Sequence, residues 1–468
     1  MAPINNDELL RRIARLSKQN RELEENLRKL EKINEKLINE NHKTKLLFEK
    51  KFPVSVKGAT GKEKIVKSLK FNMATVLYSD IHGFANVTEG YDSSVVMDEF
   101  DEIIFEFDAI CSRYKTEKIK TIGDTYMCAG GIPVKNITNP VEVVMTALEM
   151  SNFLSRYEFI KRGNSERLWN LKTGIHTGPV SASVSGKKKI SYDIKGDTVN
   201  TASRIEAVSG GGMILISVLT YELIKEFFDC EYYGMLPVKY KGHLQLFRVK
   251  GLKPEFSVDG CGMMPNAAFH TKFALIRFND LQEVILDKLE KELPRYLHYH
   301  NVKHTVDVVT EVELIGWAEG CTDEEILILK TAGLLHDAGH TIEYDNHEFH
   351  STNIAREILP SYGYTTDQIE QICSVIMATK LPPRPSNLLE SIICDSDLDY
   401  LGRSDFIPVS NNLYDELVAQ NKMGSLNDWN KIQVKFISGH QYFTETARNL
   451  REVNKQLQIE RLLRKIEE

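Results

Sequence analysis

The earliest hydrophobic pattern in the chain is a heptad repeat between Leu9 and Phe48. Leucine recurs every seven residues at position d, and position a mixes apolar residues with asparagine. The d positions are Leu9, Leu16, Leu23, Leu30 and Leu37, and the a positions are Ile13, Asn20, Leu27, Asn34, Asn41 and Phe48. Neither glycine nor proline interrupts the repeat, which therefore predicts one helix of about 60 Å at about 1.5 Å per residue.

Leucine at d with asparagine at a favours a parallel two-stranded coiled coil, because each asparagine finds its partner only in register. A lone, solvated helix is the alternative. Five leucines at strict spacing need a partner to bury them, so the pattern predicts a dimer.

After the heptad, short β-like runs alternate with helical stretches. The pattern predicts strands at Met73–Ser79, Lys118–Cys128, Leu171–Thr177 and Val180–Ser185, and helices at Ser93–Tyr114 and Val141–Tyr157. This alternation is typical of a ferredoxin-like α+β sheet. From Ala267 onward the pattern is helical, which predicts an all-α domain.

These changes of pattern divide the chain into five segments. They are a coiled coil (7–50), a linker (51–70), an α+β domain (71–249), a linker (250–266) and an all-α domain that ends in charged helices (267–468). A length of 468 residues agrees with more than one hydrophobic core.

Composition narrows the class of protein. The chain is 42% hydrophobic with a net charge of -7, which argues against general nucleic-acid binding. Its seven cysteines are scattered and form no CxxC pair, a usage that fits a reducing compartment. The N-terminus does not resemble a signal peptide, and no apolar run approaches the ~18 residues that span a bilayer. We therefore expect a cytoplasmic protein without membrane insertion.

Two aspartates mark the first candidate site. Asp80 follows the predicted strand Met73–Ser79, and Asp124 follows the run Lys118–Gly123. Carboxylates at the ends of neighbouring strands can hold hard cations such as Mg²⁺, which take oxygen ligands and leave room for phosphates. Two such ions can support an in-line displacement at phosphorus.

Four pieces, YSDIHGF, KIKTIGDTYM, GIHTGPV and DTVNTASRIE, occur in this order between about 71 and 249. Together they closely resemble the catalytic domain of class III nucleotidyl cyclases. The resemblance implies two Mg²⁺ or Mn²⁺ ions on Asp80 and Asp124, with the backbone carbonyl of Ile81 as a further contact. In that family the site lies between two such domains. One chain here carries both sets of residues, so a homodimer with two equivalent sites is implied.

The resemblance also assigns a catalytic pair, Asn200 and Arg204, to the ribose and the transition-state phosphate. Their i, i+4 spacing puts both on one face of a helix. The planar guanidinium of Arg204 suits phosphate oxygens. A surface salt bridge between Arg204 and Glu206 is the alternative interpretation.

Base choice depends on Lys120 and Asp193, which match adenylyl cyclase positions. Lysine only donates hydrogen bonds and an ionised aspartate only accepts them. Adenine offers an acceptor at N1 and a donor at its 6-amino group, whereas guanine reverses both, so the pair favours ATP over GTP. An ordinary surface ion pair between the two residues is the alternative.

A phosphate-binding lysine is expected in VKYKGHLQLFRV. Lys239 is the first choice and Lys241 the second. Tyr240 interrupts the VKGKG pattern that is usual in the family.

The helical domain holds a second constellation, in YHNVKHTVDV, LLHDAGH, NHEFHS and CDSDLDYLG. The order H…HD…H…D resembles the HD superfamily of metal-dependent phosphohydrolases, over about 267–420. The resemblance implies the metal ligands His304, His336, Asp337 and Asp397, with Asp395 as the alternative to Asp397. His340 and His347 would hold a second metal or orient the first. Mixed nitrogen and oxygen ligation suits Mn, Fe, Co, Ni or Zn more than Ca.

YHNVKHTVDV is also similar to a motif of class I cyclic-nucleotide phosphodiesterases. That similarity implies that His300 protonates the leaving oxygen and that His304 binds metal. The rest departs from that family, because HDAGH replaces HDxxHPG and the purine-gripping glutamine has no clear counterpart. The substrate therefore stays open, with cAMP the first to test, and a site that only senses a ligand is the alternative.

The sequence predicts a homodimeric adenylyl cyclase that uses ATP and carries a C-terminal HD phosphohydrolase domain. A guanylyl cyclase is one alternative. A second is an HD phosphohydrolase regulated by a nucleotide-binding, cyclase-like domain, and a third is a signalling scaffold assembled by the coiled coil.

Overall fold

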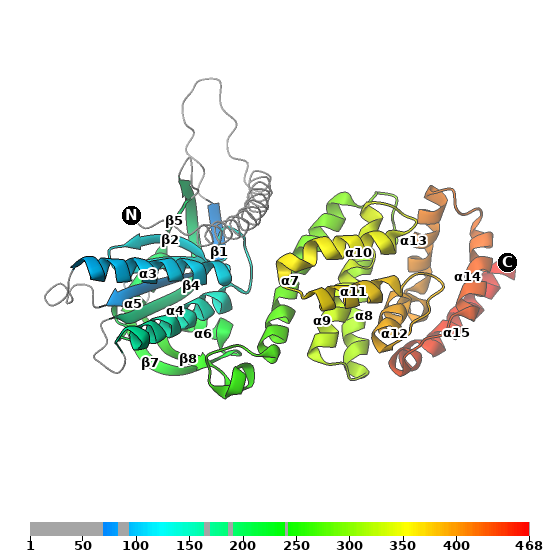
Figure 1. Cartoon of the computed structure of the whole chain (residues 1–468). Helices are drawn as coiled ribbons and strands as arrows, with labels where there is room; N and C mark the ends of the chain where they lie inside the picture. The colour runs from blue at the N-terminus through cyan, green and yellow to red at the C-terminus, as the bar shows by residue number, and fades with distance from the viewer. Residues whose placement is uncertain (1–68, 83–92, 163–168, 186–190, 239–241, 468) are drawn as a thin grey trace, which may run out of the picture. The chain divides into compact units, whose positions relative to one another are not determined.

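The computed structural model describes residues 69–82, 93–162, 169–185, 191–238 and 242–467. The predicted coiled coil, nearly all of the linker 51–70, and Lys239 and Lys241 lie outside these residues. Within them, an α+β domain precedes an all-α domain (Figure 1). The predicted α+β and all-α classes are thereby confirmed, whereas the coiled coil and the domain boundaries stay predictions.

A mixed sheet of eight strands forms the centre of the α+β domain, counted over the described residues. The strands are β1 (Leu69–His82), β2 (Glu117–Ile122), β3 (Thr125–Gly130), β4 (Asn170–Ser185), β5 (Ser191–Lys195), β6 (Met213–Ser217), β7 (Phe228–Val238) and β8 (Gly242–Leu252). Their order is β2-β3-β1-β4-β6-β8-β7, and β5 pairs with β4 outside that path. β1 lies next to the β2–β3 hairpin and pairs with β3 antiparallel.

Helices cover both faces of this sheet. α3 (Ser93–Arg113) and α4 (Asn139–Arg162) lie side by side over one face (Figure 1). Phe107 of α3 and Val144 of α4 share one buried cluster with Leu77 of β1. α5 (Asp197–Ala207) packs Ile205 against Leu215 of β6 in a separate cluster, and α6 (Val218–Ile224) follows β6. The face under α3 and α4 is therefore buried, whereas α5 covers part of the other face.

Three elements differ from the sequence prediction. The two strands expected at 171–177 and 180–185 form one strand, β4, because the chain stays extended through Gly178 and Pro179. Proline fixes φ near -65°, which an extended strand accepts. Asp80 lies within β1 rather than after it, and β8 continues to Leu252, into the predicted linker 250–266.

The second domain consists of helices. They are α7 (Ala267–Glu292), α8 (Val302–Ala318), α9 (Asp323–Leu335), α10 (His347–Ile358), α11 (Thr366–Met377), α12 (Leu388–Asp397), α13 (Phe406–Ala419), α14 (Leu426–Gly439) and α15 (Glu445–Glu467), with short 3₁₀ turns that include η3 (Ala338–Thr341) and η5 (Asp399–Gly402). Val312 of α8, Leu329 of α9 and Ile393 of α12 belong to one buried core. That core brings together the three helices whose C-terminal or N-terminal turns carry the predicted metal ligands.

Polar side chains cap several of these helices. Asn301 accepts hydrogen bonds from the backbone N–H groups of Lys303 and His304, so the first turn of α8 is fixed where His304 lies. Thr322 and Glu325 form a capping box at α9. Capping satisfies backbone donors that a helix start leaves without partners. The Asn301 cap therefore holds the turn that carries His304, whereas the capping box lies at the end of α9 away from His336.

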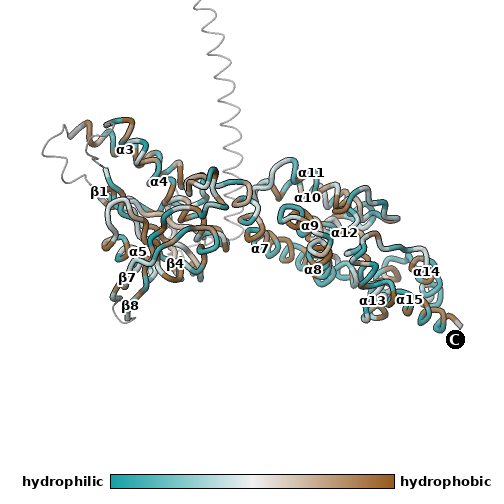
Figure 2. The backbone as a smooth tube through the Cα atoms, turned by 90° about the horizontal axis from the view of Figure 1, so that it is seen from below, coloured by the Kyte–Doolittle hydropathy of each residue, from teal (hydrophilic) through white to brown (hydrophobic). Residues whose placement is uncertain are grey.

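Hydrophobic and hydrophilic stretches alternate along the helical half of the chain (Figure 2). Within the described ranges, no helix combines the length and the apolar character that crossing a membrane requires.

Candidate active sites

The two predicted cyclase aspartates lie side by side. In the β1–β3 ladder Asp80 is opposite Thr125, the residue after Asp124. The backbone N–H of Ile81 donates to the carbonyl oxygen of Asp124 at 3.0 Å. Asp124 lies in the β2–β3 turn, where Gly123 adopts φ +62°, a conformation that glycine accepts readily. Strand pairing and a glycine turn thus bring both carboxylates to one edge.

Glu206, at the end of α5, is a third carboxylate near this pair. Burial, and then the charge of Asp80, raise the pKa of Glu206 to about 7 although Lys172 opposes the shift. Carboxylates that raise one another's pKa form a locus of negative charge that divalent cations neutralise. The residues present therefore fit the predicted metal pair. The sequence reading mentioned Glu206 only as a partner for Arg204.

Asn200 and Arg204 are both exposed on α5. Among the described residues, neither side chain has a hydrogen bond or an ion pair, so the predicted salt bridge between Arg204 and Glu206 is not formed there. α5 packs directly against β4 at Gly174, where an added Cβ would lie 2.1 Å from the backbone nitrogen of Glu206. This close contact fixes the height of α5 over the sheet and leaves Arg204 free for a ligand.

The two predicted base-reading residues meet across β2 and β5. Lys120 Nζ lies 3.2 Å from Asp193 Oδ1, and both side chains are partly exposed. Lys195 Nζ lies 3.7 Å from the other carboxylate oxygen of Asp193. This contact is the ion pair that the alternative interpretation expects, and it also brings both side chains within reach of one ligand edge.

The four predicted ligands of the HD site converge on one point. His304 Nε2 lies 3.1 Å from Asp397 Oδ1, 3.3 Å from His336 Nε2 and 3.4 Å from Asp337 Oδ2. His336 Nε2 lies 3.1 Å from Asp337 Oδ2 and 3.5 Å from Asp397 Oδ1. The side chains come from α8, the end of α9 and the end of α12.

These separations provide a test of metal binding. Bonds of about 2.0–2.2 Å from a metal to nitrogen or oxygen place neighbouring ligand atoms about 3.0–3.5 Å apart. His336 Nδ1 lies 2.8 Å from the carbonyl oxygen of Gly333, to which it donates, so Nε2 keeps its lone pair for the cluster. Asp337 Oδ2 is buried without a hydrogen-bond partner among the described residues. The donor set fits a transition metal.

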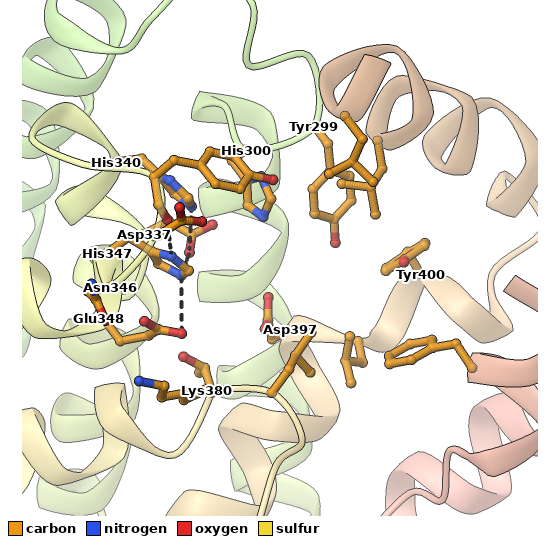
Figure 3. Close-up of a pocket in the computed structure, with 18 of the residues that line it drawn as sticks. Tyr299, His300, Asp337, His340, Asn346, His347, Glu348, Lys380, Asp397 and Tyr400 are labelled. Atoms are coloured by element: carbon orange, nitrogen blue, oxygen red, sulfur yellow. Dashed lines mark hydrogen bonds and ion pairs between the residues drawn. The ribbon is translucent and has the colours of Figure 1, made fainter. Parts of the chain in front are cut away.

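The other oxygen of Asp337 faces a second group of histidines. Asp337 Oδ1 lies 3.5 Å from His347 Nε2 and 3.9 Å from His340 Nε2, and Figure 3 shows these histidines gathered around Asp337. Both ring nitrogens of His340 are buried and have no hydrogen-bond partner within the described part of the chain, and burial lowers the pKa of His340 to about 3. A neutral, unpartnered imidazole beside a shared carboxylate is suited to a second metal ion.

His300 lies at the same cavity but is held by a residue that the sequence reading missed. Glu416, on α13, accepts from His300 Nδ1 at 2.5 Å and is fully buried. Burial alone would lower the pKa of His300, but the hydrogen bond with Glu416 and then the charge of Asp337 raise it. Glu416 therefore favours the protonated form of His300. No motif marks Glu416, which is 116 residues away in sequence.

Asp395 and Asp397 were left as alternatives by the sequence. The structure places Asp397 beside His304, whereas the carboxylate of Asp395 accepts hydrogen bonds from Phe443 and Thr444. The two carboxylates thus serve different partners.

A cavity of about 500 Å³ opens over the histidine cluster (Figure 3). Its polar end holds His300, Asp337, His340, His347, Glu348, Lys380 and Asp397, and its apolar end holds Leu398, Leu413, Leu417, Trp429, Ile432 and Phe436. Among the described lining residues, Lys380 is the single side chain of the lysine or arginine type. With divalent metal ions at the histidine cluster, the cavity would suit a ligand with an anionic end and a flat apolar end.

Gln433 of α14 is the polar group of the apolar end. Its Oε1 accepts from Ser410 Oγ at 2.7 Å, and Ser410 Oγ accepts from Trp429 Nε1 at 3.2 Å. Because the indole N–H can only donate, the serine hydroxyl is left to donate to Gln433, whose Nε2 stays available to a ligand. The sequence reading sought a glutamine and did not place it. Gln433 and Phe436 are three residues apart and lie on one face of a helix, and this spacing was the pattern that could have identified the glutamine.

Two family models match the chain. The adenylate and guanylate cyclase catalytic domain matches residues 66–251, and the HD domain matches residues 301–399. The receptor-type guanylate cyclase gcy-8 of Caenorhabditis elegans is 37% identical over 191 residues, 40% of this chain and 16% of that protein. The soluble guanylate cyclase subunit beta-2 of Homo sapiens is 32% identical over 227 residues, 48% of this chain and 36% of that protein.

Solved structures give similar matches. The catalytic core of a rhodopsin-guanylyl cyclase with converted specificity, in complex with ATPalphaS, is 32% identical with a TM-score of 0.36, and covers 40% of this chain and 98% of its own. The adenylyl cyclase CyaB from P. aeruginosa is 27% identical with a TM-score of 0.36, and covers 39% of this chain and 95% of its own.

The chain therefore contains a class III nucleotidyl cyclase catalytic domain and an HD domain. It spans only 16% and 36% of the length of the two curated relatives described above.

Proposed function

We propose that this chain forms cAMP and pyrophosphate from ATP in a homodimer, and that its HD domain hydrolyses a phosphoester, with a cyclic nucleotide as the first candidate. The observation that carries the choice of ATP is the contact of 3.2 Å between Lys120 Nζ and Asp193 Oδ1. Lysine can donate to adenine N1, and aspartate can accept from the 6-amino group. Guanine would leave both groups facing the wrong partner.

At the cyclase site, Asp80, Asp124 and the carbonyl of Ile81 would hold two Mg²⁺ or Mn²⁺ ions. When bound, such ions supply positive charge that lowers the pKa of the attacking hydroxyl and neutralises the phosphates. Asn200 orients the ribose, and Arg204 binds the phosphate oxygens on which charge develops. Both groups are exposed on α5, which supports a site completed by a second copy of the chain.

At the HD site, His304, His336, Asp337 and Asp397 would hold one divalent metal, and His340 and His347 with Asp337 a second. Such ions supply Lewis acidity toward a phosphoryl oxygen. His300, whose protonated form the hydrogen bond with Glu416 favours, would donate a proton to the leaving oxygen.

The cavity supports a cyclic nucleotide as the substrate of the HD site. A purine can lie against Phe436 while Gln433 meets its edge, and the phosphate then lies at the histidine end with Lys380. Apolar walls with a few placed polar groups are typical of such pockets. A volume of about 500 Å³ suits a mononucleotide.

Two other functions remain as alternatives. The curated relatives described above are guanylate cyclases by name, which favours GTP. In the other alternative, the cyclase-like domain binds nucleotide and regulates the HD hydrolase without turnover.

Turnover by the purified chain separates these possibilities. With ATP and GTP offered separately, we expect cAMP to form faster than cGMP, with no product of either kind from Asp80→Ala. Faster cGMP formation would assign the chain to GTP, and no cyclic product from either nucleotide would favour the regulatory alternative. In the same preparation, consumption of added cAMP that depends on Asp337 tests the HD site.

A further inference from the structure

The carboxylate of Asp395 clamps the start of the C-terminal helix. It is fully buried, and it accepts the backbone N–H of Phe443 at 2.9 Å. It also accepts both the backbone N–H and the hydroxyl of Thr444 at 2.8 Å. α15 begins at the next residue. One carboxylate therefore ties the end of α12 to the first turn of α15.

Asp395 lies only two residues before the candidate metal ligand Asp397. Both belong to the last turn of α12, a helix of 10 residues. Any movement of that turn that follows loss of the clamp also moves Asp397, whose Oδ1 lies 3.1 Å from His304 Nε2. Metal sites tolerate errors of only about 0.5 Å in the placement of their ligands.

α15 also presses on the segment that follows Asp397. A Cβ added to Gly402 of η5 would lie 2.5 Å from the Cβ of Arg451 and 2.6 Å from its carbonyl oxygen. The helix therefore lies against bare backbone. Gln458 Nε2 donates to the carbonyl oxygen of Arg403 at 3.1 Å, which extends the contact for two further turns.

A second set of contacts ties α15 to α8, the helix that carries His304. Arg451 binds Asp399 of η5 at 2.5 Å and reaches Glu311 of α8 at 3.4 Å. Glu319, at the other end of α8, accepts the backbone N–H of Thr446 at 2.8 Å. α15 thus bridges the two elements that provide His304 and Asp397.

We propose that Asp395 is a positioning residue for the HD metal, and that α15 is an obligatory part of the metal site rather than an appended helix. The hydrogen bonds from Phe443 and Thr444 set the turn that presents Asp397 to His304. The proposal rests on the proposed function, because it requires that His304, His336, Asp337 and Asp397 bind metal.

Cobalt binding tests the proposal without reference to activity. The full chain is prepared with Asp80→Ala and Asp124→Ala, so that Co²⁺ absorption reports on the HD site. Asp395→Asn keeps the size of the side chain but weakens its acceptance of four hydrogen bonds. We expect Co²⁺ affinity to fall about 10- to 100-fold, the usual effect of losing a group that supports a metal ligand.

Glu319→Gln is the matched control. It weakens the same kind of bond, from a carboxylate to a backbone N–H in the first turn of α15, but it lies 15 residues from His304. We expect this variant to lower the melting temperature as Asp395→Asn does while keeping the Co²⁺ affinity of the wild-type HD site. An equal loss of affinity in both variants would overturn the specific role of Asp395.

Thr444→Val changes the hydrogen-bond donor of the clamp and leaves the sequence of α12 unchanged. It removes one hydrogen bond to Asp395, whereas Thr444→Ser keeps the hydroxyl. If Asp395→Asn does not fold, the two Thr444 variants decide: weaker Co²⁺ binding by the valine variant and not by the serine variant supports the clamp, and equal binding overturns it.

A chain with intact HD residues that binds no Co²⁺ would overturn both the hydrolase and the clamp. A chain that binds Co²⁺ equally well with Asp395→Asn would overturn the clamp alone.

Discussion

Glu416 holds His300 in two places. Its Oε1 lies 2.5 Å from His300 Nδ1, and its Oε2 accepts the backbone N–H of His300 at 3.2 Å. The ring therefore cannot turn without breaking a charge-assisted bond, and its Nε2 remains for the cavity. Glu416 itself stays ionised: burial would raise its pKa, but the hydrogen bond from His300 lowers it. The pair is built as an oriented proton donor.

Glu416→Gln should lower kcat for phosphoester hydrolysis by tenfold or more, because an amide neither charges nor orients the imidazole as a carboxylate does. His300→Ala should cost about 10²–10⁴-fold, the usual contribution of a general acid. The pH profile of kcat for Glu416→Gln should lose activity at a lower pH than the wild type does. Metal content should not change in either variant, and unchanged kcat with normal metal content would contradict the role of the pair.

The sequence located the histidines of this site but not what controls them. His300, His304 and His336 are found by spacing, because motifs lie within one or two helical turns. Glu416 meets His300 only because α13 folds back onto the segment before α8, and no local pattern encodes that contact. The choice between Asp395 and Asp397 also depended on the tertiary contact between Asp395 and the start of α15, which the sequence does not show.

Gln433→Ala should raise KM for a cyclic nucleotide by about tenfold and leave the metal centre intact, because it removes the hydrogen-bonding group at the apolar end of the cavity. Ser410→Ala should give a smaller rise, since it only frees the amide that Ser410 now orients at 2.7 Å. Steady-state kinetics with cAMP and cGMP give both values. A fall in kcat with constant KM would place Gln433 outside the base-binding region.

The cyclase domain was better predicted, since its site is made of short segments in fixed order. A short motif marks each aspartate, and the pairing of β1 with β3 then brings Asp80 to Asp124 although α3 and β2 lie between them in the chain. Glu206 was given no role, because its proximity to Asp80 depends on how α5 packs on Gly174. The continuous strand β4 was missed because Gly178 and Pro179 usually end strands.

The double variant Lys120→Glu with Asp193→Cys should reduce ATP turnover far more than GTP turnover. The change replaces a donor with an acceptor and removes the carboxylate that lies 3.2 Å away. Loss of the hydrogen bonds that match the edge of the base typically lowers kcat/KM by about 10²-fold or more. Turnover of each nucleotide is measured separately. Equal losses for ATP and GTP would contradict base reading by this pair and favour a general structural role.

His440 should make the HD domain sensitive to acid. Among the residues that the structure describes, its two buried ring nitrogens have no hydrogen-bond partner. Burial, and then Lys455, lower the pKa of His440 to about 4 from an ordinary 6.5. The unfolded chain binds this proton more readily, so the stabilisation is complete above about pH 6.5 and is lost as pH falls toward 4. Melting temperatures from pH 7 to pH 5 should fall more for the wild type than for His440→Leu. Parallel curves would rule out His440 as the cause.

Chains that carry Asp80→Ala, mixed with chains that carry Arg204→Ala, should regain cyclase activity although each is inactive alone. The cyclase resemblance implies that the metal aspartates and the arginine of one site come from opposite chains. A mixed dimer then has one site with both lesions and one intact site. At equal amounts and free exchange, half of the dimers are mixed, so activity should reach about a quarter of the wild-type value.

The measurement is cAMP formation after unfolding and joint refolding, with exchange followed by two affinity tags. Mixing Asp80→Ala with Asp124→Ala is the control, because each of the two sites then carries one damaged metal aspartate and no intact site can form. Exchange without recovery in the first mixture would contradict a site shared between chains.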